Sequence, residues 1–307
     1  MIENAIRAFT GTTPTDVSSI SGGHINDSFL VTAGDKYVLQ RMNGRLYAPY
    51  LDAISNNYSL YQKSCDKYFS DGWVCPKWLT VKDGGFFYAD EEGSIFRMYR
   101  YIPSDEVSSP DVFETGKGLG TMHAILKECK GIVEIGPNMR LYDLPYYYRK
   151  YTEQNNETKM RDPDLDRVIE ERIGYMLGIS VPGGYVIHGD AKIGNMLYNG
   201  RRIAGFIDLD TIMPGSIFND LADCARSCCL NNDNRPDPSK IVKLVKGYEE
   251  GRNATFTESA VDLLGKTMVR NMFMLGLRYY TDVLSEEGYF EGMSNLQKLS
   301  RARDLLL

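Results

Sequence analysis

Three polar residues near the middle of the chain have the types and the spacing of a group-transfer site. Asp190 is followed by Asn195, and Asp208 comes after a further apolar run. Short apolar segments flank them, so we expect one loop and two short strands that bring these side chains to one edge. Phosphoryl transfer from ATP needs a carboxylate that accepts the proton of the attacking hydroxyl. It also needs an amide oxygen and a second carboxylate that hold Mg²⁺ against the phosphates. The pattern therefore predicts Asp190 as the catalytic base and Asn195 and Asp208 as ligands of Mg²⁺.

Other residues of the same segment have roles that the sequence leaves open. Asp210 is predicted as a second metal contact or as an acceptor of a hydrogen bond from the substrate, and the alternative is a helix cap. Lys192 is expected to reach a phosphate oxygen of ATP, unless it is an exposed loop lysine. We expect His188 to hold the loop through a hydrogen bond and not to carry protons.

The first third of the chain is expected to form a meandering antiparallel sheet with one helix against it. Turn signals separate apolar runs and place strands at residues 28–32, 37–42, 77–81, 86–89 and 94–101. Residues 50–67 carry apolar side chains at helical spacing. Pro103 cannot continue a ladder of strands, so residues 101–104 are the predicted hinge. The hinge divides an N-terminal lobe, residues 1–101, from a C-terminal lobe, residues 102–307.

The second lobe is expected to be mainly helical, interrupted by the strands around Asp190. Apolar periodicity places helices at residues 112–128, 164–177, 220–227, 238–249, 257–285 and 294–306. Residues 131–160 are polar and rich in tyrosine, and they either shape a substrate pocket or form a surface helix pair. The predicted fold class is therefore α+β, a two-lobed fold with a small antiparallel sheet and one helix in the first lobe and helices in the second.

Composition and charge argue against several classes of protein. The 307 residues carry a formal net charge of −6, which gives no electrostatic support to nucleic-acid binding. No apolar stretch reaches the length of a membrane span, and the acidic first residues are not a secretory signal. The six cysteines form no C-x-x-C pair and there are three histidines, so we expect no zinc site. Scattered cysteines of this kind favour free thiols in the cytosol.

The segment 188–195 resembles the catalytic loop of aminoglycoside phosphotransferases and choline kinases, and Asp208 resembles their metal-binding aspartate. The shared pattern is H-G-D-x-x-x-x-N followed by an apolar residue and Ile-Asp. Further segments are similar to N-acetylhexosamine 1-kinases and run in the same order along the chain. They are residues 22–29, 37–43, 208–215, 276–282, 288–290 and 301–303. The resemblance implies a protein-kinase-like fold with ATP and Mg²⁺ in the cleft between two lobes.

The resemblance also assigns residues to ATP. Gly22 and Gly23 lack a Cβ atom and would let the backbone approach the triphosphate, although a Gly-Gly turn also makes an ordinary hairpin. Arg41 occupies the position of the basic residue that grips the phosphates, and the alternative is a surface arginine at a strand end. The start of the hinge is expected to contact the nucleotide through Arg100, Tyr101 and Ile102.

The helix after Arg41 lacks the glutamate that related kinases usually pair with this basic residue. Asp52 or Asn56 would have to substitute for it. Asp220 resembles the buried aspartate that braces the catalytic loop in the same superfamily. The alternative is that Asp220 caps a helix.

For the acceptor, the resemblance points to His24, Asp190, Asp210, Thr211, Arg278 and Tyr289. Arg278 lies in an apolar helix, where a charge needs a partner, so the alternative is an ion pair with Asp282. For His24 and Tyr289 the alternative is a packing role.

The sequence thus favours a cytosolic ATP-dependent kinase, a phosphotransferase with an alcohol group as acceptor. The favoured acceptor is an N-acetylhexosamine, GlcNAc or GalNAc, phosphorylated at its anomeric hydroxyl to give the 1-phosphate. One alternative is the same fold acting on an aminoglycoside, choline, ethanolamine or homoserine. Another is an inactive module that binds nucleotide or sugar. We expect a monomer or homodimer with no nucleic-acid or membrane partner.

Overall fold

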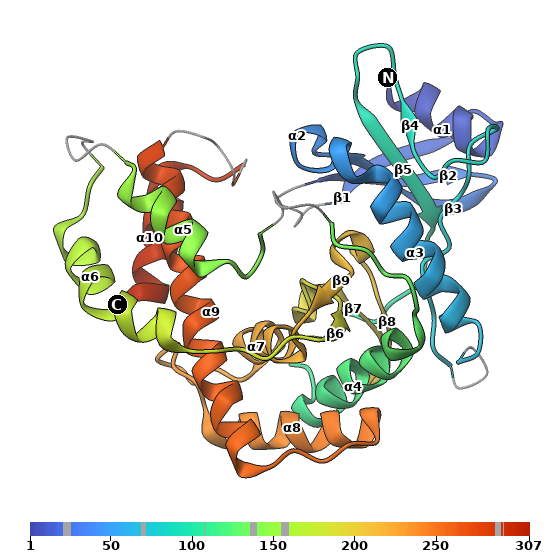
Figure 1. Ribbon diagram of the computed structural model, residues 1–307. Helices are drawn as coiled ribbons and strands as arrows, with labels where there is room; N and C mark the ends of the chain where they lie inside the picture. Colours follow the sequence, from blue (N-terminus) through green and yellow to red (C-terminus); the bar gives the residue numbers. More distant parts are fainter. Residues whose placement is uncertain are drawn as a thin grey trace.

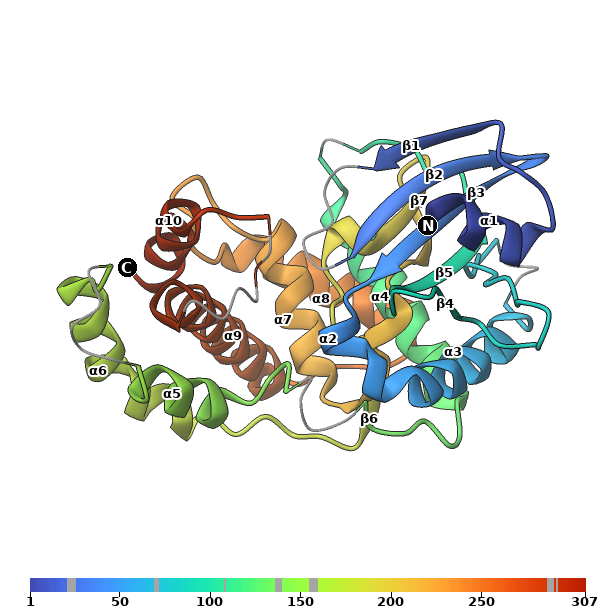
Figure 2. The ribbon, with the colours of Figure 1, turned by 90° about the horizontal axis from the view of Figure 1, so that it is seen from above.

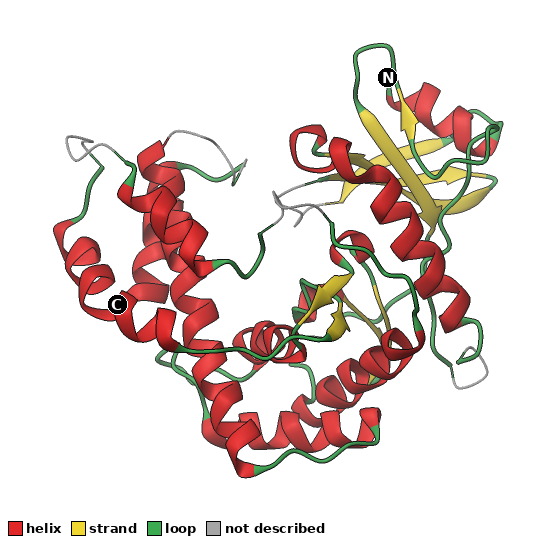
Figure 3. Ribbon diagram, in the orientation of Figure 1, coloured by secondary structure: helices red, strands yellow, loops and turns green. Residues whose placement is uncertain are grey.

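The protein is a two-lobed α+β molecule, as the sequence predicts (Figure 1). The computed structural model describes residues 1–20, 26–68, 72–107, 109–135, 140–154, 160–285, 290 and 292–307. The sheet and the helices beside it make up one lobe, and the other lobe is mainly helical (Figure 3).

Within the described residues, the N-terminal lobe is built on a five-stranded antiparallel sheet in the order β1-β2-β3-β5-β4. Its strands are β1 (Asp16–Ile20), β2 (Asp27–Ala33), β3 (Asp35–Met42), β4 (Tyr88–Ala89) and β5 (Ile95–Arg100). Its helical segments are α1 (Ile2–Thr10), α2 (Gly44–Tyr47), a 3-10 turn (Ala48–Tyr50) and α3 (Leu51–Cys65). Helix α1 packs on one face of the sheet and α3 on the other.

Two predictions for this lobe need correction. Of the strand predicted at residues 77–81, the described chain keeps one bridge, between Trp78 and Tyr99. Helix α1 and strand β1 lie outside the predicted elements, although Ala5, Ile6 and Phe9 of α1 are all buried. They are buried because α1 covers an apolar sheet face that would otherwise remain in water.

Alternation along β3 decides which of its side chains can reach the space between the lobes. Val38 packs with α3, whereas Leu39 packs in the cluster that α1 covers. Because successive side chains of a strand point to opposite faces, Gln40 shares the face of Val38 and Arg41 shares the face of Leu39. Gln40 therefore points toward the second lobe, and Arg41 points away from it.

The C-terminal lobe combines helices with two short hairpins. Its helices are α4 (Val112–Glu128), α5 (Leu144–Thr152), α6 (Pro163–Gly178), α7 (Ile217–Cys228), α8 (Pro238–Arg252), α9 (Glu258–Ser285) and α10 (Asn295–Leu306). In the hairpins, β6 (Tyr185–Ile187) pairs with β9 (Met213–Gly215), and β7 (Met196–Asn199) pairs with β8 (Arg202–Phe206).

Polar caps explain why the sequence locates these helices to within a few residues, except α5, which lies in the region 131–160 for which no helix bounds were predicted. Side chains that precede the helices accept hydrogen bonds from first-turn amides, which otherwise lack a partner. These N-caps are Asp111, Asp143, Asp162, Ser216, Asp237 and Ser294. Helix α7 begins at Ile217 instead of residue 220, because Ser216 caps it.

The helices form two groups joined by α9. Helix α9 packs against α7 at the group that lies under the sheet, and against α5 and α10 at the other group. Seen from above, the second group lies beside the N-terminal lobe, not beneath it (Figure 2). Residues of α9 can therefore face both the catalytic segment and the second helical group.

Helices α4 and α8 approach each other through glycines. A Cβ atom on Gly116 would lie 2.0 Å from the carbonyl oxygen of Leu244, and one on Gly247 would lie 2.0 Å from that of Phe113. A side chain larger than hydrogen would collide with backbone at both places. This close packing fixes α4, which carries His123 to the catalytic segment.

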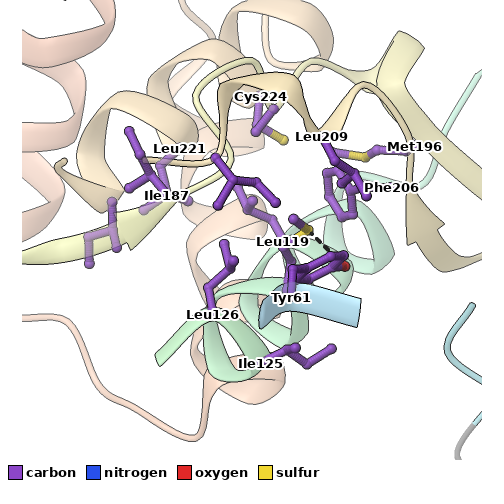
Figure 4. Close-up of a cluster of buried hydrophobic side chains, with 14 of the residues drawn as sticks. Tyr61, Leu119, Ile125, Leu126, Ile187, Met196, Phe206, Leu209, Leu221 and Cys224 are labelled. Carbon is purple, nitrogen blue, oxygen red and sulfur yellow. Dashed lines mark hydrogen bonds between the residues drawn. The ribbon is translucent and has the colours of Figure 1, made fainter. Parts of the chain in front are cut away.

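A buried apolar cluster supports the segment 187–209 (Figure 4). Ile187 directly precedes the catalytic loop, and Leu209 directly follows Asp208. Both side chains are almost completely buried. They pack with residues of the neighbouring helices, among them Leu119 of α4 and Leu221 of α7. The polar residues between Ile187 and Leu209 are thereby anchored at both ends.

Among the described helices, none has the length and apolar character needed to cross a membrane. The six cysteines are free thiols, as predicted.

Candidate active site

A cavity of about 780 Å³ lies between the two lobes. Asp190, Asn195 and Asp208 all line this cavity, so the structure brings the three predicted residues together. Asp190 follows β6, Asn195 ends a short 3-10 turn before β7, and Asp208 follows β8. The two hairpins therefore deliver the polar residues to one edge.

Gly189 allows the catalytic loop to touch the segment after Asp208. Its φ angle is +85°, and a Cβ atom at this position would lie 2.4 Å from the carbonyl oxygen of Thr211. The Thr211 hydroxyl donates a hydrogen bond of 2.7 Å to the carbonyl oxygen of His188. Glycine before Asp190 is thus a requirement of the contact between the two segments.

Asp220 braces the catalytic loop from α7. Its fully buried carboxylate accepts hydrogen bonds from the backbone amides of His188 and Gly189, at 2.7 and 2.9 Å. It also lies 2.9 Å from Nε2 of His123 on α4. Because Ser216 caps α7, the alternative of a capping role for Asp220 is wrong.

His188 is tied into the loop through both ring nitrogens. Nε2 lies 2.9 Å from the carbonyl oxygen of Ile207, so it carries the proton and donates. Nδ1 accepts a hydrogen bond from the backbone amide of Asp190 at 3.2 Å. The imidazole therefore holds the loop in place, the role expected from the sequence.

We predict that His123 makes the stability of the fold depend on pH. Burial lowers the pKa of His123, and the hydrogen bond to Asp220 only partly opposes this. The unfolded chain then binds the proton more readily than the folded protein. This contribution to stability is complete above about pH 6.5 and is lost as the pH falls toward the lower folded-state pKa, by at most about 1.4 kcal/mol per pH unit.

Chemical denaturation at about pH 7.5 and about pH 5.5 tests this prediction. The wild type should lose more free energy of unfolding between the two values than the His123→Gln variant, which cannot take up the proton. Equal losses in the two proteins would contradict the prediction.

Asp190 is surrounded by groups that keep it anionic. Nζ of Lys192 lies 2.7 Å from its Oδ2, and Nδ2 of Asn195 lies 2.9 Å from the same oxygen. Burial acts to raise the pKa of Asp190, but the Lys192 ammonium and these hydrogen bonds outweigh it and lower the pKa. Asp190 is therefore ionised at neutral pH and able to accept a proton.

Asn195 and Asp208 provide a donor set that suits Mg²⁺. The amide nitrogen of Asn195 donates to Asp190, which directs the hard amide oxygen to the role of a cation ligand. Asp208 has φ of 57°, a left-handed conformation that is costly for a non-glycine residue and typical of functional sites. Among the described residues, no group of three or more His, Cys, Asp or Glu side chains could hold a metal. A magnesium ion held by few protein ligands together with phosphates fits this arrangement.

Asp210 forms a buried ion pair that connects the lobes. Arg97 of β5 holds both carboxylate oxygens, with Nη1 on Oδ1 and Nη2 3.0 Å from Oδ2. Gln40 Oε1 accepts two further hydrogen bonds from Arg97, and the guanidinium carbon lies 4.4 Å from the centre of the Trp78 ring. Because Arg97 takes both oxygens of Asp210, Asp208 is the better placed of the two as a metal ligand.

The structure does not bring Arg41 to the cavity. Its guanidinium pairs with Asp27 and both side chains are exposed, whereas the alternation of β3 places Gln40 on the cavity side. Gln40 is the cross-strand partner of Arg97. The expected grip of Arg41 on the phosphates is therefore corrected: the buried cation near this position comes from β5, not from β3.

Helix α3 meets the second lobe through an amide and not through a carboxylate. Nδ2 of Asn57 donates to the carbonyl oxygens of Val133 and Ile212, both at 2.8 Å. Its Oδ1 accepts from the amide of Val133 at 2.9 Å. Asp52 and Asn56 are exposed, so neither replaces the missing glutamate.

The remaining residues predicted for the nucleotide line the cavity, lie at the surface or fall outside the described residues. Tyr101 and Ile102 line the cavity, as does Lys192. Arg100 does not, because it pairs with Asp35 at the surface, at 3.0 Å. Outside the described residues lie Gly22, Gly23, His24 and Tyr289.

The sequence did not predict that part of the cavity beside the hinge is lined by apolar side chains. Val38 of β3, Leu197 of β7 and Ile207 line the cavity together with Ile102. Apolar surfaces from both lobes suit the flat base of a nucleotide. The alternation that places Gln40 also identifies Val38, but nothing local in the sequence pairs it with Leu197.

Thr211 and Arg278 line the part of the cavity that extends from Asp190 toward α9. The guanidinium carbon of Arg278 lies 4.8 Å from the ring centre of Tyr147. Asp282, the alternative partner of Arg278, makes a buried ion pair of 2.7 Å with Lys298. Thr211 and Arg278 therefore give this part of the cavity a hydroxyl and a guanidinium.

Tyr142, Asp223 and Arg226 also line the cavity and were not predicted as site residues. The Tyr142 hydroxyl lies 2.9 Å from the carbonyl oxygen of Gly189 and 2.8 Å from Oδ2 of Asp223. Burial raises the pKa of Asp223, and the charge of Arg226 only partly offsets this. The tyrosine-rich region thus contributes at least Tyr142 to the pocket, the first of the two roles considered for it.

Sequence comparison matches residues 16–253 to the phosphotransferase enzyme family (APH). A homoserine kinase from Sinorhizobium medicae is 32% identical over 99 residues, which are 32% of this chain and 30% of that protein. A homoserine kinase from Rhizobium meliloti is 31% identical over 93 residues, 30% of this chain and 28% of that protein. The matched region thus spans less than a third of the length of these curated relatives.

Solved structures share the fold over nearly the whole chain. An amicoumacin kinase in complex with AMP-PNP and Ca²⁺ has a TM-score of 0.69 at 13% identity, covering 99% of this chain and 91% of that one. A spectinomycin phosphotransferase in complex with ADP and spectinomycin has a TM-score of 0.61 at 14% identity, covering 99% and 92%. A choline/ethanolamine kinase family protein from Mesorhizobium loti has a TM-score of 0.59 at 15% identity, covering 97% and 88%.

Proposed function

The chain belongs to the phosphotransferase enzyme family, and from this premise we propose that it is an ATP-dependent kinase of a small molecule that bears a hydroxyl group. One observation carries the proposal. Asp190, Asn195 and Asp208 meet at a single cavity of about 780 Å³, with Lys192 beside Asp190. That volume lies within the range of about 300–1,000 Å³ that is usual for ligand pockets.

Asp190 orients the acceptor hydroxyl and accepts its proton while the hydroxyl oxygen attacks the γ-phosphorus of ATP and ADP leaves. Asn195 and Asp208 would hold Mg²⁺, which would supply positive charge to neutralise the phosphates. Lys192 keeps Asp190 ionised and adds positive charge beside the transferred group. Asp220 and His188 position the loop without contact with the reacting atoms.

The preferred acceptor is an N-acetylhexosamine, phosphorylated at its anomeric hydroxyl. Several short segments support this choice by their similarity to N-acetylhexosamine 1-kinases, among them residues 208–215 and 276–282. The acceptor part of the cavity offers both donors and acceptors of hydrogen bonds, including Thr211 and Arg278, which suits a neutral sugar.

Homoserine is the second candidate. The local similarity to homoserine kinases supports it. Asp223 and Arg226 both line the cavity and lie on one face of α7. Oδ1 of Asp223 is 3.7 Å from Nε of Arg226. An acceptor with both an ammonium and a carboxylate would find an acidic and a basic partner there.

The release of ADP from Mg²⁺-ATP across an acceptor panel tests the proposal. The panel contains GlcNAc, GalNAc, glucose, galactose, homoserine, choline, ethanolamine and kanamycin. Turnover confined to N-acetylhexosamines is expected, with the 1-phosphate as product. Turnover of homoserine alone would keep the kinase chemistry and replace the sugar. Binding of ATP without turnover of any compound would instead favour an inactive binding module.

A further inference from the structure

Helix α9 presents one continuous face to the cavity. Asn271, Met274, Leu275 and Arg278 all line it, and their spacing of three, four and seven positions places them on one side of a helix. The mechanism and the family resemblance assign Arg278 but leave Asn271 without a role. Asn271 is the polar residue of this face that lies deepest, with 3% of its surface exposed.

The side-chain oxygen of Asn271 is a buried acceptor that the rest of the described chain does not satisfy. Within the described residues, Oδ1 of Asn271 has no hydrogen-bond partner. Its Nδ2 lies 3.5 Å from Oδ1 of Asn219 on α7, a contact that orients the amide. A buried acceptor without a partner costs free energy in the folded protein, so such a group is expected where a ligand supplies the partner.

We propose that Asn271 is a specificity-determining residue of the acceptor site, whose Oδ1 accepts a hydrogen bond from an O–H or N–H group of the acceptor. This inference rests on the proposed function and concerns a group other than the hydroxyl that reacts at Asp190. A sugar hydroxyl, an amide N–H or an ammonium group can donate to Oδ1. A carboxylate or a phosphate cannot, because it has no proton to donate.

A hydrogen bond to Oδ1 of Asn271 would separate acceptors that carry a second hydrogen-bond donor from those that do not. The only hydrogen-bond donor of choline is its reacting hydroxyl, and its trimethylammonium group has no N–H. Choline would therefore leave Oδ1 of Asn271 buried and unsatisfied, whereas ethanolamine, homoserine and a hexosamine would not. A buried polar group left without a partner is a strong source of discrimination between similar ligands.

The Asn271→Leu variant separates a binding role from a structural one. Leucine has a similar size but no polar atom, so it removes the unsatisfied acceptor from the core. The unliganded variant should therefore unfold at the same temperature as the wild type or a higher one. The KM of the acceptor that the wild type phosphorylates should rise by about 10- to 100-fold, while the KM of ATP stays nearly constant.

A matched control lies one turn earlier on the same helix. Thr267 is fully buried and does not line the cavity, and its hydroxyl donates to the carbonyl oxygen of Leu263 at 2.8 Å. Thr267→Val should lower the unfolding temperature and leave the acceptor KM unchanged, the reverse of the pattern expected for Asn271→Leu. Deoxy analogues of GlcNAc then identify the donor, because the wild type but not Asn271→Leu should discriminate against the analogue that lacks it.

An unchanged acceptor KM in Asn271→Leu would overturn the inference, whatever its unfolding temperature. A failure of the proposed function gives a different result, namely no turnover of any panel compound by the wild type. In that case, the rise in unfolding temperature caused by each panel compound becomes the readout. A rise that Asn271→Leu loses supports the role of Asn271, and a rise that it keeps, or no rise in the wild type, contradicts it.

Discussion

Asp190→Asn is expected to lower kcat by about 10²- to 10⁴-fold, because asparagine cannot accept the proton of the attacking hydroxyl. The substitution preserves the shape of the side chain. It also leaves an oxygen that Lys192 and Asn195 can approach, as they do Oδ2 of Asp190 at 2.7 and 2.9 Å. The KM values for ATP and acceptor should therefore change much less than kcat. Steady-state release of ADP with the best acceptor of the panel measures the effect.

Asp223→Asn provides a control for this experiment. The substitution makes the same chemical change in the same cavity, but Oδ2 of Asp223 accepts a hydrogen bond from the Tyr142 hydroxyl, and Asp223 is not the proposed base. Its loss of kcat should be far smaller than that of Asp190→Asn. Equal losses in the two variants, with both proteins folded by thermal unfolding, would remove Asp190 from the role of base.

The second large effect concerns the ion pair between Arg97 and Asp210. Arg97→Met should lower the free energy of unfolding by about 3–5 kcal/mol, because it leaves the buried Asp210 carboxylate without its counter-charge. Both side chains are at most 3% exposed, so water cannot replace the lost partner. Gln40 would also lose the donor of two hydrogen bonds. Denaturant titration of wild type and variant measures the difference.

A control for Arg97→Met lies on the same strand. Arg100 pairs with Asp35, but both side chains are more than 60% exposed. Arg100→Met should therefore cost about 0–1 kcal/mol, as expected for a surface pair. The double variant Arg97→Met/Asp210→Asn should recover part of the stability, since no buried charge remains. A cost for Arg97→Met as small as that for Arg100→Met would show that the pair does not hold the lobes together.

Local patterns in the sequence were sufficient for the catalytic segment. His188, Gly189 and Asp190 lie in a short loop between apolar strands, and their residue types and spacing are read from a few neighbouring positions of the chain. The hydrogen bonds from this loop to Ile207 and Asp220, by contrast, join residues 19 to 32 positions apart. The helices of the second lobe were likewise located from local patterns. Their caps and their apolar periodicity act within one or two turns of the chain.

The sequence did not predict the register of the N-terminal sheet. A shift of one residue moves a side chain to the other face, and this one-residue difference separates Gln40, which lines the cavity, from Arg41, which pairs with Asp27. The role of Arg97 depended on the same register, because its place beside Gln40 follows from the pairing of β3 with β5. Similarity to a family motif assigned the basic residue to Arg41 of β3, whereas the buried arginine beside the cavity is Arg97 of β5.

The sequence by itself indicated the chemistry that we propose for this protein, since the types and spacing of Asp190, Asn195 and Asp208 are properties of a short stretch of chain. The tertiary structure alone decided what surrounds that chemistry. The Arg97–Asp210 pair joins residues 113 positions apart, and Asn271 reaches the cavity only because α9 packs between two helical groups. Contacts of this kind form when distant apolar faces are buried against each other, and no local periodicity encodes which polar side chains then meet.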